Sequence, residues 1–435
     1  MDETSGLSNP AMPALPELME HLFRRQAGRI VSYLAGLLGS RHLQLAEDAV
    51  QEAILRAAQI WPFQGVPEKP EAWLFRVAHN HAITALRRDS SFEGKTAELI
   101  ARLETHASHS EEDMDLERHL RDDELRMIFM CCHPDLAQDV HVALSLKLAG
   151  GFSVGEIARI FLAEESTIAQ RLVRAKRLIR ERNLPLAMPQ RGEIEKRLDS
   201  VLNVIYLMFS GGYGAHSGEE LIRRDVCLEA LRLGRLLAAS SMAAPRIHAL
   251  VALMAFQAAR LPARTDAAGD LVLLEEQDRS LWDRELVSLG FHYFDRSIAG
   301  PVISQWHVQA AIAATYAKAE TAIDWTEILD HYDQLAEMTA SPVVALNRAV
   351  AVMKVHGAEA ALLALAPLEV HPALRGYHLL PAVRGRFLTE LGRFTEAEAA
   401  FSAALKCDCT QPERRFLLRQ RQSIQAFFGS NPSMP

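Results

Sequence analysis

A cluster of cationic, amide and hydroxyl side chains between residues 166 and 180 has the chemistry of a nucleic-acid-binding surface. Its members are Ser166, Thr167, Gln170, Arg171, Arg174, Lys176, Arg177 and Arg180. Arginine and glutamine can donate paired hydrogen bonds to base edges in the DNA major groove, and the cations can also contact phosphates. The cluster therefore predicts DNA recognition, although a basic helix that is only solvated has a similar composition.

The spacing of the apolar residues indicates which elements carry this cluster. Ile168, Leu172, Ala175 and Ile179 recur at the interval of one helical face, so the polar residues occupy the other faces. Upstream, Ser153 and Glu156 have the spacing of a capping box, and Ile157, Ala158 and Phe161 form a buried face. Residues 152–182 are therefore predicted to form a helix, a tight turn and a longer basic helix.

A second polar group lies on a predicted helix over residues 46–57. The inward positions are Ala46, Val50, Ala53 and Ala57, and the outward ones are Asp48, Gln51, Glu52 and Arg56. Asp48 and Glu52 have the same charge one turn apart, which slightly destabilises an isolated helix and favours a basic partner. A solvated acidic face is the commoner explanation of such a pair.

A third group lies on a predicted helix over residues 73–88. Apolar Trp73, Leu74, Val77 and Ala78 alternate with Arg76, His79, Asn80, His81, Arg87 and Arg88. Aromatic, amide and basic groups on one helix suit the unstacked bases and the phosphates of single-stranded DNA. Trp73 taken alone is more typical of a core residue than of a stacking platform.

The composition favours an all-α protein with several folded parts. Of the 435 residues, 49% are hydrophobic, and proline and glycine are mostly confined to short clusters, which suits packed helices. A chain of this length exceeds a single core. The pattern predicts a disordered N-terminus at 1–14, helical domains at 15–89 and 124–185, and a helical extension at 190–435. Between the two domains, residues 90–123 are predicted to be a solvated acidic linker with one helix at most.

The end of the extension has the small and large residue spacing of a tetratricopeptide helix pair. The matching residues are Gly385, Leu388, Gly392, Phe394, Ala397, Phe401 and Ala404. In such a pair, small residues let the helices approach and aromatic rings fill the groove. Gly357 suggests a degenerate copy about one repeat upstream, and two unrelated helical hairpins are the alternative.

Several other classes of site and location are disfavoured. The five cysteines form no C-x-x-C pair, which indicates a reducing cytoplasm. No segment has the length and hydropathy of a membrane helix, and the N-terminus lacks a basic start and an apolar run. Adjacent Cys131, Cys132 and His133 strain tetrahedral zinc coordination. We therefore expect no metal, no cofactor and no catalysis, and the net charge of −8 argues against a protein coated in nucleic acid.

The order of these motifs resembles the sigma factors of bacterial RNA polymerase. AEDAVQEAILRAA (46–58) resembles region 2.2, EAWLFRVAHNHAITALRR (71–88) resembles regions 2.3 and 2.4, and GFSVGEIARIFLAEESTIAQRLVRAKRLIRE (151–181) resembles region 4.2. Two sigma domains without a middle domain are typical of the extracytoplasmic function (ECF) group. SGGYGAHSGEELIRRD (210–225) and DLVLLEEQDRSLWDR (270–284) resemble the ECF subgroup with a tetratricopeptide-like extension.

The resemblance implies partners and roles for the polar groups. Core RNA polymerase would be bound through its β′ clamp helices and β flap, with Asp48, Gln51 and Glu52 on the clamp helices. Promoter −10 DNA would be bound by Arg76, Asn80 and Arg87, with Asn80 near the pocket for a flipped base. The −35 element would be read by Ser166, Thr167, Gln170, Arg171 and Arg174. The position of His79 is often basic in the family, so its role is open.

The extension and the basic helix also allow two other functions. The extension could hold a regulatory protein or peptide on a concave surface. The chain could instead be a helix-turn-helix regulator, or a tetratricopeptide scaffold, that acts without polymerase. Neither alternative needs an acidic helix followed by a helix rich in Trp, Asn and Arg, so residues 46–88 discriminate among the three.

Overall fold

The computed structural model describes residues 15–88, 95–109, 113–161, 163–214, 221–319 and 322–430. The predicted all-α fold is confirmed: these ranges contain nineteen α-helices and short 3-10 turns, and their one β-bridge is an isolated pair between Thr265 and Leu271. The predicted disordered N-terminus at 1–14 lies outside the described residues. Within those ranges, no helix combines the length and the apolar character that crossing a membrane requires.

The chain folds into two compact units. The first runs up to Arg159 and resumes from Ala163 to Val201, and the second runs from Leu202 onward and includes the last residues of helix α7. The helices that begin in the first unit are α1 (Leu15–Leu38), α2 (Leu43–Gln64), α3 (Pro70–Arg88), α4 (Lys95–His109), α5 (Asp113–Cys131), α6 (Gln138–Leu148), α7 (Val154–Phe161), α8 (Glu165–Arg182) and α9 (Arg191–Tyr213).

Helix α1 packs against both halves of the first unit. It contacts α2 on one side and α5 and α6 on another. At Gly28 a Cβ atom would lie 2.0 Å from the carbonyl oxygen of Ala149, so only glycine permits this approach. Beside it, buried Arg29 lies 3.9 Å from Glu124, which has no exposed surface. The halves at 15–89 and 124–185, expected to be separated by a linker, therefore share one core.

The prediction of a solvated linker at 90–123 is wrong for the residues of this segment that the structure describes. It contains α4 and most of α5, and Leu103 of α4 and Leu120 of α5 are buried. The acidic residues obscured this apolar stripe in the sequence. Asp123 is itself buried, beside Gly36 of α1. The segment is therefore part of the packed unit instead of a solvated connection.

The second unit is an array of helices. They are the end of α9, then α10 (Arg224–Ala238), α11 (Pro245–Ala259), α12 (Arg284–Ser297), α13 (Gln305–Lys318), α14 (Trp325–Met338), α15 (Pro342–His356), α16 (Ala358–Leu365), α17 (Leu379–Glu390), α18 (Phe394–Ala404) and α19 (Gln411–Ser430). Consecutive helices pack against each other from α10 to α19. Helix α11 is buried almost all round, from Ile247 to Ala259, and is the centre of the first part of this array.

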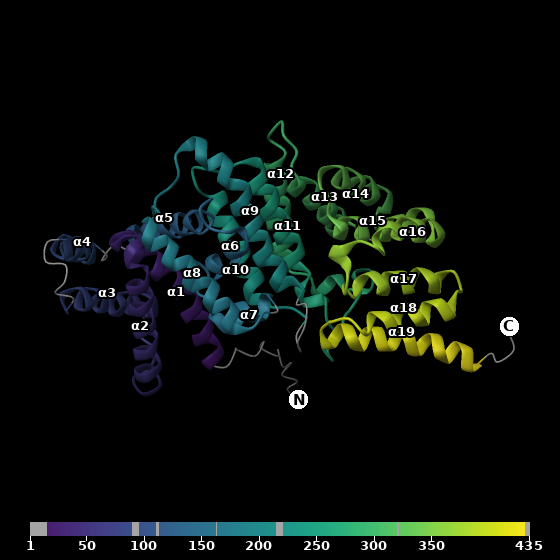
Figure 1. The fold of residues 1–435 in the computed structure, drawn as a ribbon, viewed down its shortest axis with the longest axis horizontal. Coiled ribbons are helices and arrows are strands. Elements are labelled where there is room, and N and C mark those ends of the chain that lie inside the picture. The colour runs from purple at the N-terminus through teal and green to yellow at the C-terminus, as the bar shows by residue number, and fades with distance from the viewer. Residues whose placement is uncertain are drawn as a thin grey trace, which may run out of the picture. The chain divides into compact units, whose positions relative to one another are not determined.

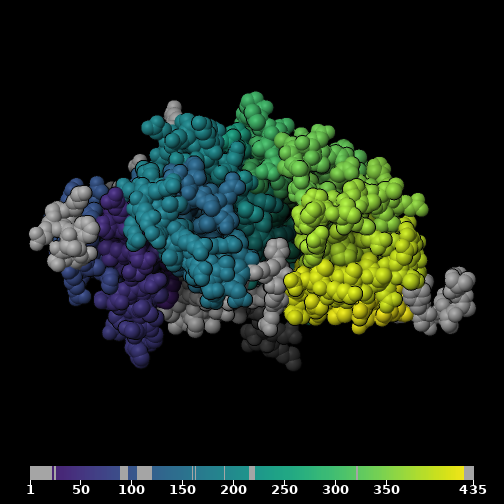
Figure 2. All heavy atoms as spheres, viewed as in Figure 1, coloured from purple at the N-terminus to yellow at the C-terminus, as the bar shows by residue number. Residues whose placement is uncertain are grey.

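The last three helices lie side by side at the C-terminal end of the second unit, coloured yellow in Figure 1 and forming a closed block in Figure 2. Gly385 of α17 faces Phe401 of α18, where a Cβ atom would lie 3.0 Å from the ring. Leu388, Ala397 and Ala404 are fully buried in the same cluster. These contacts have the small and large pairing that the sequence predicts, and the tetratricopeptide assignment itself stays a prediction.

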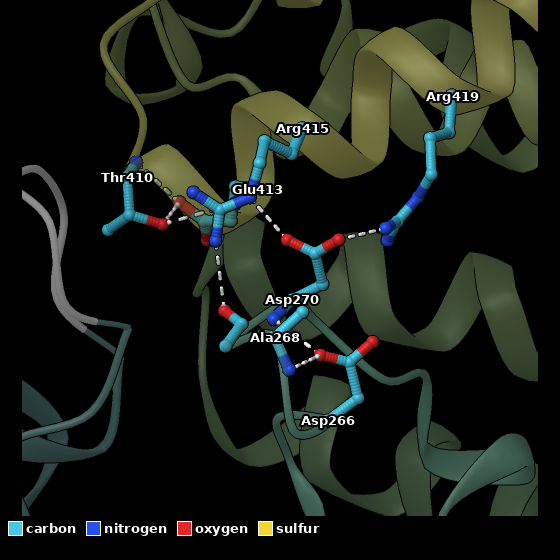
Figure 3. A network of polar contacts seen from close by, with 8 residues as sticks. Asp266, Ala268, Asp270, Thr410, Glu413, Arg415 and Arg419 are labelled. Atoms are coloured by element: carbon cyan, nitrogen blue, oxygen red, sulfur yellow. Dashed lines mark hydrogen bonds and ion pairs between the residues drawn. The ribbon is translucent and has the colours of Figure 1, made fainter.

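An ion-pair network joins the loop after α11 to α19 (Figure 3). Asp270 accepts hydrogen bonds from Arg415 and Arg419, and Arg415 also donates to the carbonyl oxygen of Gly269 at 3.2 Å. Asp266 shapes the loop by accepting backbone hydrogen bonds from Ala268 and Asp270, both at 2.9 Å. Residues far apart in the sequence are thereby held together within the second unit.

Candidate nucleic-acid interface

The helix pair α7 and α8 forms as the sequence predicts. Ser153 and Glu156 make the reciprocal capping box, with bonds of 2.7 and 3.2 Å. Helix α8 buries the four predicted residues Ile168, Leu172, Ala175 and Ile179. It ends at Asn183, whose positive φ of 48° and backbone bonds to Arg180 and Ile179 are those of a left-handed cap.

Most predicted base-reading residues of α8 lie exposed at its N-terminal half. Ser166, Thr167, Gln170 and Arg174 are exposed, and Arg174 has no ion-pair partner among the described residues. Arg171 is only half exposed, because its guanidinium faces Asp139 of α6 at 4.0 Å. The geometry therefore favours Arg174 over Arg171 as a free donor.

The C-terminal half of α8 is turned toward α2. Lys176 donates to Glu47 at 2.7 Å, and Glu47 is buried. Nearby, Arg41 donates to the side chain of Asn183 at 3.1 Å. Burial lowers the pKa of Lys147, although Glu47 opposes that shift. The sequence pattern predicts Lys176 on the polar surface and no role for Glu47. The two residues are far apart in the sequence, so their spacing does not reveal that they form a pair.

The outward face of α2 is as predicted, but its charges are already partnered. Asp48 and Gln51 are exposed, and Glu52 is partly exposed. Gln44 donates to Asp48 at 2.9 Å, and Arg56 donates to Glu52 at 2.7 Å. Because each carboxylate has a partner on its own helix, the repulsion between them is weak evidence for a basic partner.

Helix α3 presents Arg76, Asn80 and Arg87 to solvent. Arg87 pairs with Glu104 of α4 at 2.7 Å, whereas Arg76 and the Asn80 amide have no side-chain partner among the described residues. His79 is instead buried, with its ring nitrogen 3.1 Å from the carbonyl oxygen of Leu103, and cannot contact phosphate from there.

Trp73 is partly buried at the edge of the core, which agrees in part with the expectation that it is a core residue. Its ring packs edge-on against that of buried Trp61, with centroids 5.4 Å apart. Trp73 therefore helps to hold α3 against α2 and is not a free stacking platform. The exposed residues Arg76, Asn80 and Arg87 remain the candidates of α3 for DNA contact.

Comparison with known proteins identifies the part of the chain that carries α2 and α3. Residues 22–92 match sigma-70 region 2. This match supports a sigma-factor family for the part of the chain that contains α2 and α3. An uncharacterized protein of Rhizobium meliloti (strain 1021) is 40% identical over 392 residues, which are 89% of this chain and 91% of that protein. The two proteins are therefore relatives along nearly their whole length.

The region 2 match includes every candidate residue on α2 and α3. Residues 197–298 match a family of unknown function, DUF6596, so the extension has relatives without an assigned role. No solved structure matches the chain. Sigma-70 region 2 implies binding to core RNA polymerase and promoter DNA.

The cysteines of the first unit have the properties of core residues. Cys131 and Cys132 are buried, and burial raises the pKa of Cys132 to about 12. The thiolate, which is the metal-binding form, is therefore strongly disfavoured. No group of three or more potential metal ligands occurs in the described ranges.

Proposed function

We propose that this chain is an ECF sigma factor that binds core RNA polymerase and directs it to promoters, under the control of its C-terminal extension. The observation that carries the proposal is the sigma-70 region 2 match at residues 22–92, followed in the chain by the exposed basic face of α8. Sigma factors are non-enzymatic, so the assigned roles are binding roles.

On this proposal, α2 binds the polymerase. Asp48, Gln51 and Glu52 lie on one exposed face of α2 and would contact the β′ clamp helices. Asp48 and Glu52 would exchange their hydrogen bonds with Gln44 and Arg56 for contacts with the polymerase. Loss of these surface contacts has a modest electrostatic cost for association. The β flap would bind the part of the chain around α6 to α8.

The DNA contacts divide between α3 and α8. Asn80 would bind a base flipped out of the melted −10 element, and Arg76 and Arg87 would contact phosphates nearby. On α8, Ser166, Thr167, Gln170, Arg171 and Arg174 would read the −35 element in the major groove. The free amide of Asn80 and the free guanidinium of Arg174 support these assignments.

The contact between Lys176 and Glu47 limits how far apart α8 and α3 can lie when they bind the −35 and −10 elements. Promoter positions −10 and −35 are about 25 base pairs apart, which is about 85 Å along B-DNA. Helix α2 has 22 residues and is about 33 Å long. Helices α8 and α3 both contact α2, and α2 is much shorter than the distance between the two promoter elements. On this proposal, α8 and α3 must therefore separate before one chain can contact both elements.

The extension would act on the sigma module by docking in one state and releasing it in another. It has its own apolar core, and its helix array can present a concave surface to a regulatory protein, a peptide or the sigma module. A signal couples to promoter access only if it binds the two states with different affinity.

Two experiments test the proposal. The full chain should co-purify with core polymerase, whereas a regulator or scaffold that acts without polymerase would not. Residues 1–190 end just before α9, so this fragment cuts no helix and removes the extension together with residues 191–201 of the first unit. A gain of transcription from the fragment would indicate inhibition, a loss would indicate a required contact, and equal activity would reject control by the extension.

A further inference from the structure

A cavity of about 320 Å³ lies inside the second unit. It is lined from five helices, α9, α11, α13, α14 and α15, together with Arg260 directly after α11 and Leu274 of a 3-10 turn. Its volume is at the small end of the range for ligand sites, which suits a small molecule better than a peptide. None of the functions assigned above uses it.

The cavity wall carries one cation and no carboxylate, while Glu275 lies near enough to contribute to the raised pKa of Tyr316 in that wall. Arg260 lines the cavity, and its lining contains no Asp or Glu. Arg260 donates to the hydroxyl of Tyr213, Arg264 to the carbonyl oxygen of Tyr213, and Arg279 to the carbonyl oxygen of Ala319. In the part of the chain that the structure describes, none of these three guanidinium groups forms an ion pair.

The three arginines also affect one another. Burial lowers the pKa of Arg264, and Arg260 adds to the effect, although Tyr213 opposes it. Burial likewise lowers the pKa of Arg279, again with a contribution from Arg260. Of the three, only Arg260 lines the cavity, and repulsion from the other two favours an anion at its guanidinium group, because a bound anion relieves that repulsion.

Neutral donors line the same cavity. The hydroxyl groups of Tyr316 and Tyr332 and the amide of Asn347 have no hydrogen-bond partner among the described residues. Burial raises the pKa of Tyr332 to about 12, so its hydroxyl keeps its proton at neutral pH. Polar groups that lack partners and face a cavity are suited to orient a ligand.

Aromatic rings supply the apolar part of the wall. Tyr316 and Trp325 pack edge to face with centroids 5.8 Å apart, and Tyr206 and Tyr332 also line the cavity. Such rings favour a flat unsaturated guest that can stack or meet them edge-on. Tyr206 is already bound to Gln309 at 3.2 Å, which fixes that side of the wall.

We propose that this cavity binds a small aromatic carboxylate, with the carboxylate at Arg260 and the ring against Tyr316, Trp325 and Tyr332. The cavity joins α9 and α11, within the DUF6596 match, to α13, α14 and α15 beyond it. Binding would therefore tighten the packing between these two parts of the extension. A role for the ligand in transcription rests on the proposed sigma function, whereas binding itself does not.

The test measures binding of benzoate, benzamide and acetate to the purified full chain by calorimetry, without polymerase. We expect saturable binding of benzoate with a Kd of about 1 mM or lower, as about nine heavy atoms permit. Benzamide lacks the charge and acetate lacks the ring, so both should bind at least about tenfold more weakly. A failure here leaves the sigma assignment untouched.

Variants locate the site. Arg260→Gln should weaken benzoate binding about tenfold or more, and Tyr332→Phe, which keeps the ring and the fold, about fivefold. Arg384→Gln is the matched control, because Arg384 pairs with Glu369 at 3.0 Å and does not line the cavity. Absence of saturable benzoate binding, equal binding of benzamide, or unchanged affinity in both cavity variants would each overturn the proposal.

Discussion

The two units present their polar side chains in opposite ways. In the first unit Asp48, Asn80 and Arg174 lie exposed on the surfaces of three different helices. In the second unit Arg260 and Tyr332 line a partly open pocket. Exposed groups spread over long helices suit large partners such as polymerase and DNA, whereas groups converging on a cavity suit a small ligand. If both proposals hold, the first unit acts in transcription and the second unit binds the small ligand.

The largest effect is expected from reversing the charge on α2. Asp48→Arg with Glu52→Arg should abolish association with core polymerase in a pull-down, because both residues lie on the proposed contact face and leave the core of α2 untouched. Circular dichroism should show an unchanged helical content. Wild-type retention of polymerase would remove α2 from the interface.

A matched control uses two exposed acids of the second unit. Glu359→Arg with Asp408→Arg changes the net charge by the same amount and should leave polymerase binding as it was. If the control also abolishes association, overall charge and not the face of α2 determines binding.

A smaller effect is expected on α8. Arg174→Ala should cost about 1 to 3 kcal/mol of promoter binding and relax the preference at one base of the −35 element. Arg171→Ala should cost less, because Arg171 already faces Asp139. Binding to a randomised −35 library would measure both, and unchanged selectivity in both variants would mean that the recognition face has been misplaced.

Substitution of Asp270 tests whether its ion pairs with Arg415 and Arg419 stabilise the second unit. Hydrogen bonding from Arg415, together with the charges of both arginines, holds the pKa of Asp270 below its usual range. Its contribution to stability is therefore complete above about pH 4 and is lost as the pH falls through the lower folded value.

Asp270→Asn should lower the melting temperature at neutral pH and have a smaller effect in acid. Asp408→Asn, at an exposed aspartate of the same unit, should change little at either pH. A penalty for Asp270→Asn that is the same at both pH values would show that ionisation of Asp270 does not contribute.

The smallest effect on function is expected at the contact between α8 and α2. Lys176→Met removes the cation that is hydrogen-bonded to buried Glu47, leaves only the more distant Lys147, and should lower the free energy of unfolding by about 2 kcal/mol. Adding Glu47→Gln should restore most of that loss. Because the proposed function requires this contact to open on promoters, the double variant should initiate transcription at least as well as the wild type. A loss of initiation with stability retained would place the contact in the active form.

Much of the fold followed from periodicity. The buried faces of α2 and α8, the capping box at Ser153 and the helical nature of the extension were all predicted and confirmed. The shared core of the first unit was not predicted. It depends on Gly28 meeting Ala149 and on buried Arg29 near Glu124, contacts between distant residues that a local pattern does not reveal.

For the candidate sites, too, features of a single helix could be predicted from the sequence, and contacts between helices could not. Exposure of Asp48, Asn80 and Arg174 could be predicted because it depends on the face of a single helix. Burial of His79 and the pairing of Lys176 with Glu47 depend on a second helix packing alongside. The cavity at Arg260 needs five helices at once, so no segment of the sequence indicates it.

The central claim is tested most directly by transcription from a promoter library with purified core polymerase, with and without the chain. We expect a defined set of start sites that appears only when the chain is added. These start sites should disappear with the Asp48→Arg and Glu52→Arg variant and persist with its charge-matched control. Start sites that are the same without the chain, under conditions where core polymerase is active, would contradict the assignment as a sigma factor.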